Sequence, residues 1–198
     1  MRLRPSSWCG CAGAVLWVAT MAWGQAIKPD AAALHRADAA FHAGYADMQA
    51  GNHAAAQAQF AEVVKLAPQI AEGHEALGAA LLALNRAAEA VAELEKAARL
   101  KPGDGGIEAN LAIAQFRAGE GDKALAHFEE ALRITPALND PAFFDAYARA
   151  LAAAGRREDA VKEFAAEEQI TGPSAAIDDA IGTVYAQMQR WDAARDAY

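Results

Sequence analysis

An interval of 34 residues recurs along this chain, and it constrains the possible folds more than any other feature. Pro68, Pro102 and Pro136 follow one another at this interval. Two further series keep the same step, one of alanines and one of large apolar residues: Ala56, Ala90, Ala124; Phe60, Leu94, Phe128. After two inserted residues both series continue, at Ala160 and Phe164. A period of this length, held over four units, predicts a helical repeat array.

Each unit has the residues of two helices joined by a tight turn. Small or turn-forming residues fall midway through each unit, where the left-handed backbone that ends a helix is needed: Gly51, Asn85, Gly119, Gly155, Gln189. The prolines stop the second helix. Alanine at the recurring positions lets the two helices of a unit cross closely, and the large apolar residues fill the space beside them. The segment Ala87 to Leu100 is therefore expected to pack on the segment Ala71 to Leu84 and on the next unit, because no unit closes a core alone.

These residues resemble the motif of the tetratricopeptide repeat family, a helix-turn-helix unit. The second unit matches best, with Leu77-Gly78, Ala90, Leu94 and Pro102. The resemblance implies an all-α fold, a right-handed α-solenoid of stacked antiparallel helix pairs. We place the units at 37–70, 71–104, 105–138 and 141–174, with a partial fifth unit at 175–198.

The chain departs from the motif at several positions. The early tryptophan of the motif is replaced in every unit: Ala40, His74, Glu108, Phe144, Asp178. Glu167 stands where the fourth unit would have alanine, and Gly172-Pro173 stands where it would have proline. We expect these departures to alter the packing of the first and fourth units more than the fold of the array.

The amino terminus differs in composition from the rest of the chain. Arg2 and Arg4 precede an uncharged stretch from Cys9 to Trp23, and small residues precede Gln25. This order is typical of a secretory signal peptide. We expect residues 1–24 to be a signal peptide cleaved before Gln25, and a bacterial protein exported to the periplasm or beyond. The alternative is that residues 8–23 stay as an anchor, although the apolar run is shorter than the ~20 residues of a spanning helix.

The two ends of the array carry their own expectations. Residues 25–36 are predicted to be a lead-in that caps the first unit. The fifth unit stops two-thirds of the way through, so we expect that the natural chain continues or that this end docks on a partner. The alternative function follows from this, namely the amino-terminal recognition region of a larger exported or membrane-bound enzyme or assembly factor.

Charge and motif searches exclude several functions. The formal charge is -8 with no basic run, which disfavours nucleic acid, because phosphates require positive charge. His74-Glu75 begins a zinc-protease motif, but Gly78 replaces its second histidine. The only cysteines, Cys9 and Cys11, lie in the predicted signal peptide. We therefore expect no enzymatic activity, no metal and no cofactor.

The resemblance also implies a binding groove lined by the first helix of each unit. An apolar strip with an acidic rim is expected there, and part of the strip, Met48 and Phe116 in particular, could equally pack in the core. The expected partner is a protein or peptide with apolar anchors and basic residues. The predicted groove residues are Asp38, Phe41, Tyr45, Met48, Glu72, Glu75, Leu82, Ile113, Phe116, Arg117, Asp145 and Arg149.

Taken together, the sequence predicts a non-enzymatic interaction scaffold. The family resemblance gives its fold and mode of binding, whereas the identity of the partner needs evidence from the binding site itself.

Overall fold

The structure is a computed structural model, and it describes residues 31–198. These residues form ten helices and no strand: α1 (Ala31–Gln49), α2 (His53–Leu66), α3 (Ala71–Ala83), α4 (Ala87–Leu100), α5 (Gly105–Arg117), α6 (Gly121–Ile134), α7 (Pro141–Ala153), α8 (Arg157–Thr171), α9 (Ala175–Gln187) and α10 (Trp191–Ala197). The predicted signal peptide and the first part of the predicted lead-in lie outside the described residues.

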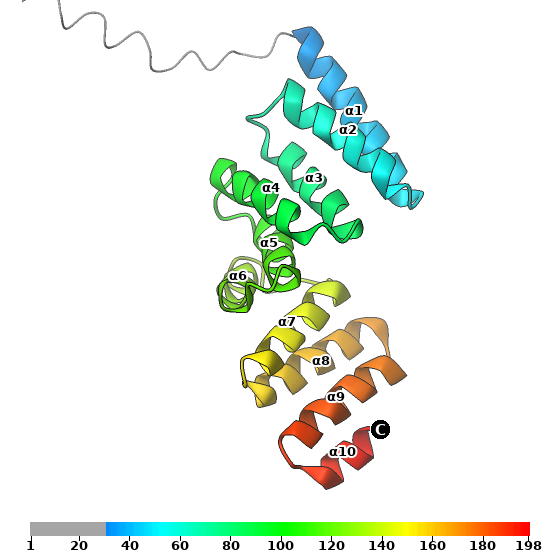
Figure 1. Ribbon diagram of the computed structural model, residues 1–198, viewed down its shortest axis with the longest axis vertical. Coiled ribbons are helices and arrows are strands. Elements are labelled where there is room, and N and C mark those ends of the chain that lie inside the picture. Colours follow the sequence, from blue (N-terminus) through cyan, green and yellow to red (C-terminus); the bar gives the residue numbers. More distant parts are fainter. Residues whose placement is uncertain (1–30) are drawn as a thin grey trace, which may run out of the picture.

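The helices form antiparallel pairs that stack one after another into an elongated coil (Figure 1). Each pair consists of one odd-numbered and one even-numbered helix, and each second helix also contacts the first helix of the next pair. The predicted all-α solenoid is confirmed. The expected contacts of α4 are confirmed as well, since it packs on α3 and on α5.

Left-handed backbone ends the first helix of every pair, at the residues that the sequence indicated. The φ angles are positive at all five: Gly51 (76°), Asn85 (57°), Gly119 (84°), Gly155 (82°) and Gln189 (58°). Asparagine tolerates this conformation better than most residues with a side chain. The chain can therefore reverse within three residues, which keeps the two helices of a pair in contact along their length.

The two helices of a pair meet where a very small residue faces a large one. A Cβ atom added to Gly78 would lie 2.6 Å from Cγ of Leu94, and one added to Gly44 would lie 2.7 Å from the ring of Phe60. In the third pair, Ala112 takes the place of the glycine and is fully buried. There is no room for more than a hydrogen atom or a methyl group at these positions, so the helices approach as closely as their backbones permit.

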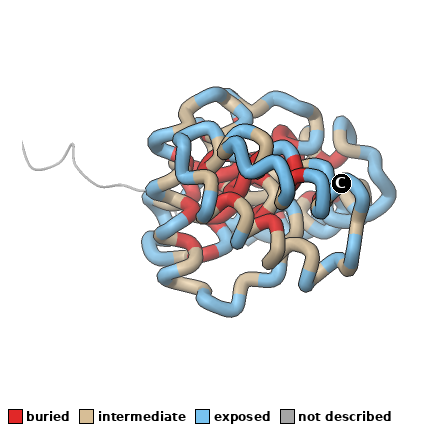
Figure 2. The backbone as a smooth tube through the Cα atoms, turned by 90° about the horizontal axis from the view of Figure 1, so that it is seen from below, coloured by how far each residue is buried: buried red, intermediate tan, exposed pale blue. Residues whose placement is uncertain are grey.

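Buried residues lie inside the coil, between the helices, with exposed residues around the outside (Figure 2), and one buried cluster runs from α2 to α8. The recurring alanines all have a relative exposure of 0%: Ala56, Ala90, Ala124, Ala160. Their burial confirms the prediction that they stand where paired helices cross.

The inserted residues 139 and 140 are accommodated between α6 and α7. The carboxylate of Asp140 accepts a hydrogen bond from the backbone N–H two residues later, at 3.0 Å, and so caps α7. An aromatic cluster fills the joint beside it, with the ring of Phe128 centred 5.1 Å from Phe143 and 5.0 Å from Tyr147. The insertion therefore leaves the core continuous across this joint.

Histidine–glutamate pairs replace the motif tryptophan in the second and third units. In the second, Nδ1 of His74 on α3 lies 2.7 Å from a carboxylate oxygen of Glu93 on α4. In the third the order is reversed, and Glu108 on α5 lies 2.6 Å from Nδ1 of His127 on α6. Both pairs join residues that are 19 apart in sequence. A polar link between the two helices of a pair thus stands where an aromatic ring would otherwise pack.

The contact of Gly78 with Leu94 should tolerate no added methyl group. We expect Gly78→Ala to lower the free energy of unfolding by about 1–3 kcal/mol, because overpacking forces the helices apart. Gly121→Ala is the matched control, since an added Cβ meets nothing within 4 Å there. The control should leave stability unchanged or raise it by up to about 1 kcal/mol. Urea denaturation measures both, and equal effects of the two substitutions would contradict the packing argument.

Because the third unit has glutamate on its first helix and histidine on its second, we expect the second unit to remain folded when its histidine and glutamate are exchanged. His74→Glu alone should cost about 2–4 kcal/mol, because it places two carboxylates together in a mostly buried position. Adding Glu93→His should recover at least half of that loss, since it restores a pair in the order of Glu108 and His127. Urea denaturation at pH 7 measures the coupling. If the changes in free energy of unfolding caused by the two substitutions simply add in the double variant, the two side chains do not interact.

Candidate functional site

Two cavities open on the face formed by the first helix of each unit, α1, α3, α5, α7 and α9, which we call the first-helix face. The N-terminal cavity lies between α1 and α3 and has a volume of about 260 Å³; it is lined by Phe41, Tyr45, Met48, Phe60, Glu72, Glu75, Ala76, Ala79 and Asn110. The C-terminal cavity lies between α7 and α9 and has a volume of about 690 Å³; it is lined by Arg149, Ala152, Ala153, Arg157, Phe164, Ala176, Asp179, Ala180, Thr183, Val184 and Gln187.

The N-terminal cavity has an apolar wall that solvent can reach. Tyr45 on α1 keeps 57% of its surface exposed. Phe41 is half-buried, with its ring centred 5.7 Å from that of Phe60. Met48 is half-buried beside them. Exposed aromatic and methionine side chains around a concave space are typical of a surface that receives an apolar side chain.

Two carboxylates on α3 face this wall, and their surroundings differ. Glu72 forms an ion pair with Lys101 at 3.1 Å, and hydrogen bonds from its own backbone amide and from Lys101 lower its pKa. Glu75 accepts a hydrogen bond from Nδ2 of Asn110 at 3.3 Å and has no ion pair within the described part of the chain. Burial raises the pKa of Glu75, and the charge of Asp104 raises it further. Glu75 is therefore an incompletely compensated acid inside an apolar cavity.

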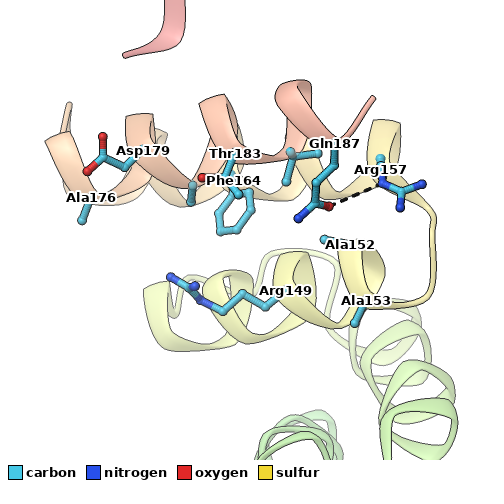
Figure 3. A pocket seen from close by; sticks show the side chains of 11 residues that line it. Arg149, Ala152, Ala153, Arg157, Phe164, Ala176, Asp179, Thr183 and Gln187 are labelled. Atoms are coloured by element: carbon cyan, nitrogen blue, oxygen red, sulfur yellow. Dashed lines mark hydrogen bonds between the residues drawn. The ribbon is translucent and has the colours of Figure 1, made fainter. Parts of the chain in front are cut away.

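The C-terminal cavity is larger and is bounded mostly by small side chains (Figure 3). Nε of Arg149 on α7 donates to a carboxylate oxygen of Asp145 at 2.7 Å, and the guanidinium lies 5.8 Å from the centre of the Phe164 ring. At the other end of the cavity, Nε of Arg157 donates to Oε1 of Gln187 on α9 at 3.4 Å. The cavity thus contains two guanidinium groups with different local partners.

The structure places the predicted groove residues in three groups. The N-terminal cavity brings together Phe41, Tyr45, Met48, Glu72 and Glu75. The C-terminal cavity includes Arg149, whose partner Asp145 lies on the same helix. The remaining five residues line neither cavity: Asp38, Leu82, Ile113, Phe116 and Arg117.

The expectation of one continuous apolar strip needs correction at Leu82 and Ile113. Both are buried, with exposures of 7% and 5%, within the core cluster that joins α3, α5 and α7. Phe116 is half-buried and packs against the same cluster, as the alternative expectation for this residue allowed. The first helices pack against one another in the middle of the array, so these side chains fill the joint and are not available to a partner.

The two other predicted residues lie at the surface. Asp38 is exposed, with a carboxylate oxygen 3.6 Å from Nε2 of His42 one turn later. Arg117 is also exposed, and its guanidinium donates to the backbone oxygen of Leu82 at 3.4 Å. Neither contributes to a cavity wall.

Sequence reasoning missed the α9 wall of the C-terminal cavity. The groove positions of the repeat are its second, fifth, ninth, twelfth and thirteenth residues. In the fifth unit they are Ala176, Asp179, Thr183, Ala186 and Gln187, and all but Ala186 line the cavity. Applying the same positions to residues 175–198 would have found them. Arg157 and Phe164 belong to α8, and no repeat position for the first helix points to them.

The described residues contain no group of three or more histidine, cysteine, aspartate or glutamate side chains that could hold a metal ion. None of the helices in residues 31–198 is both long and apolar enough to cross a membrane.

Both ring nitrogens of His74 have a partner within the protein. In addition to the contact of Nδ1 with Glu93, Nε2 lies 3.0 Å from the backbone oxygen of Pro68.

Comparison with known proteins supports the repeat assignment. Two family models described as tetratricopeptide repeat match residues 81–144 and residues 37–70. No curated protein matches the sequence significantly.

Solved structures with the same fold are similar over most of their length. YrrB, described as a TPR protein with an unusual peptide-binding site, has a TM-score of 0.65 at 19% identity, over 80% of each chain. MamA (41-end) from Desulfovibrio magneticus RS-1 has a TM-score of 0.70 at 14% identity, over 82% of this chain and 90% of the other. The pilF protein of Pseudomonas aeruginosa has a TM-score of 0.67 at 16% identity, over 84% of this chain and 75% of the other. At these identities the likeness concerns the fold. The chain therefore contains tetratricopeptide repeats, and its helix pairs form the solenoid that such repeats build.

Proposed function

We propose that this protein is a non-enzymatic interaction scaffold that binds a peptide or partner helix on its first-helix face. The N-terminal cavity receives an apolar side chain of the partner, and a neighbouring basic side chain pairs with Glu75. The observation that carries the proposal is the carboxylate of Glu75, which lacks an ion pair beside an open apolar cavity. Tetratricopeptide domains bind protein or peptide partners, so the mode of action agrees with the fold.

The apolar part of the proposal rests on the size and composition of the cavity. A volume of about 260 Å³ is enough for one large side chain. Phe41, Tyr45 and Met48 supply surface that water otherwise covers, and burying such surface favours association. YrrB, which has the same fold, is described as having a peptide-binding site, and this supports a peptide as the class of ligand.

The basic part of the proposal rests on electrostatics. The raised pKa of Glu75 shows that its charged form is poorly stabilised in the unbound protein. A lysine or arginine of the partner would stabilise that form by a charge-assisted hydrogen bond. Glu72 adds negative charge at the rim but is already paired with Lys101, so we assign the main contact to Glu75.

The cellular location belongs to the same proposal. We infer that residues 1–24 direct export and are removed before Gln25, so that the array acts in the bacterial periplasm or outside the cell. The order of charges, apolar residues and small residues in this segment supports the inference.

Fluorescence anisotropy with two labelled peptides tests the binding mode. Both peptides are blocked at their ends and flanked by glycine and serine; one carries leucine followed by lysine, the other leucine followed by glutamate. We expect the lysine peptide to bind more tightly. Glu75→Gln should weaken its binding about tenfold, because a charge-assisted hydrogen bond is lost. Tyr45→Ala should weaken binding of the leucine in both peptides.

Glu95→Gln is the matched control for this experiment. It removes the same charge from α4, a second helix, where Glu95 lies 3.9 Å from Arg99 and its charge also acts on Lys123. We expect it to leave both affinities unchanged. Equal losses for Glu75→Gln and Glu95→Gln, or equal binding of the two peptides, would contradict the proposal.

A further inference from the structure

We propose that the C-terminal cavity is a second subsite, and that it binds an acidic side chain of the same partner through Arg157. The proposal rests on the proposed function, because it assumes that a peptide lies along the first-helix face. It adds that the partner carries opposite charges at two separate points.

The cavity has room for an acidic side chain together with the backbone that carries it. Its volume is about 690 Å³, against about 260 Å³ for the N-terminal cavity. Both helical walls present small side chains, with Ala152 and Ala153 on α7 and Ala176 and Ala180 on α9. In Figure 3 the charged side chains lie toward the two ends of the cavity, with Asp179 and Arg149 at one end, Arg157 at the other and Thr183 between them.

Arg157 is the group in this cavity that lacks a carboxylate partner. Its neighbour in sequence, Arg156, has two, with Nη1 2.6 Å from Glu129 and Nε 3.2 Å from Asp159. Arg157 has no ion pair in residues 31–198, and its one side-chain hydrogen bond is a long one to the neutral amide of Gln187, at 3.4 Å. A guanidinium can donate five hydrogen bonds in a planar fork. Most of that capacity is open to a carboxylate from outside.

The other charged groups of the cavity decide where that carboxylate lies. Asp179 would repel it, but Asp179 is eight residues before Gln187 on α9, about 12 Å along the helix. Figure 3 shows Asp179 at one end of the cavity and the Arg157–Gln187 pair at the other. Arg149 points toward the Asp179 end and is already paired with Asp145 at 2.7 Å. The end formed by Arg157 and Gln187 therefore has net positive charge and a neutral hydrogen-bond donor beside it.

The contrast between the two cavities gives the partner a direction. The N-terminal cavity is lined by two acids and no base, whereas the C-terminal cavity is lined by two arginines and one acid, in a chain of net charge -8. A partner bound in reverse would bring like charges together at both cavities, which is unfavourable. Opposite charges at the two subsites therefore select one orientation of the partner.

A comparison of the binding affinities of peptides that each contain two recognition parts tests the second subsite. Each labelled peptide carries the leucine–lysine pair and, after a glycine–serine linker of about 10 to 30 residues, a leucine followed by glutamate or by glutamine. The peptides are made with the two parts in either order along the sequence. Fluorescence anisotropy then gives the affinity of each peptide for the full-chain protein. In one order, we expect the glutamate peptide to bind about tenfold more tightly than the glutamine peptide. Arg157→Gln should abolish that difference, and Arg157→Lys should keep part of it.

Arg156→Gln is the matched control, because it removes a neighbouring positive charge outside the cavity lining. It should preserve the preference for glutamate. Thermal melting monitored by circular dichroism shows that each variant is folded. The second subsite is overturned if glutamate gives no gain at any linker length, or if Arg156→Gln and Arg157→Gln reduce the gain equally. The proposed function itself fails separately, if the simple lysine peptide does not bind or ignores Glu75→Gln.

Discussion

The structure depends on one contact that is repeated in every helix pair, between a glycine or alanine on the first helix and a large side chain 16 residues later, on the second helix or, for Tyr198, directly after it. At Gly44, Gly78 and Gly182, an added Cβ would lie 2.6–2.7 Å from the facing side chain. The contact fixes how closely the two helices of a pair approach. Because each second helix also packs on the next first helix, it also fixes the spacing of the first-helix face, where both cavities lie.

The cavities lie near the two ends of the described array, and the fourth unit, beside the C-terminal cavity, departs from the repeat. Val63, Ala97 and Ala131 are buried at equivalent positions of the first three units, but the fourth unit has Glu167. One carboxylate oxygen of Glu167 is buried without a hydrogen-bond partner, and burial together with the charge of Asp145 raises its pKa.

Much of the fold could be predicted because the determining contacts are local and repeated. The interval of 34 residues located every turn, and the positive φ angles at Asn85 and Gln189 agree with it. The surface was harder to predict, since the repeat shows which residues a first helix presents but not how closely the next helix covers them. Leu82 and Ile113 have the right positions for a groove and are buried by neighbouring helices. The C-terminal cavity depends on the angle between successive pairs, which no single residue reveals.

The departures from the repeat motif have different physical roles. His74 and Glu108 replace an aromatic residue, and each forms a polar link across its own helix pair. Glu75 and Arg157 lack ion pairs within the described residues, and each lines one of the two cavities. A charged group without an ion pair inside the protein is stabilised most by an opposite charge on a partner. Such unpaired charges distinguish a binding face from a face that packs on other helices.

The central claim is that a partner lies on the first-helix face, and site-specific photo-cross-linking tests it most directly. A benzophenone amino acid would replace Ala79 or Ala153, which line the two cavities, or Ala92 or Ala126, which are exposed on second helices. The account predicts that the two-part lysine–glutamate peptide cross-links from the first two positions and not from the last two. Equal cross-linking from all four positions, or cross-linking from Ala92 and Ala126 alone, would contradict it.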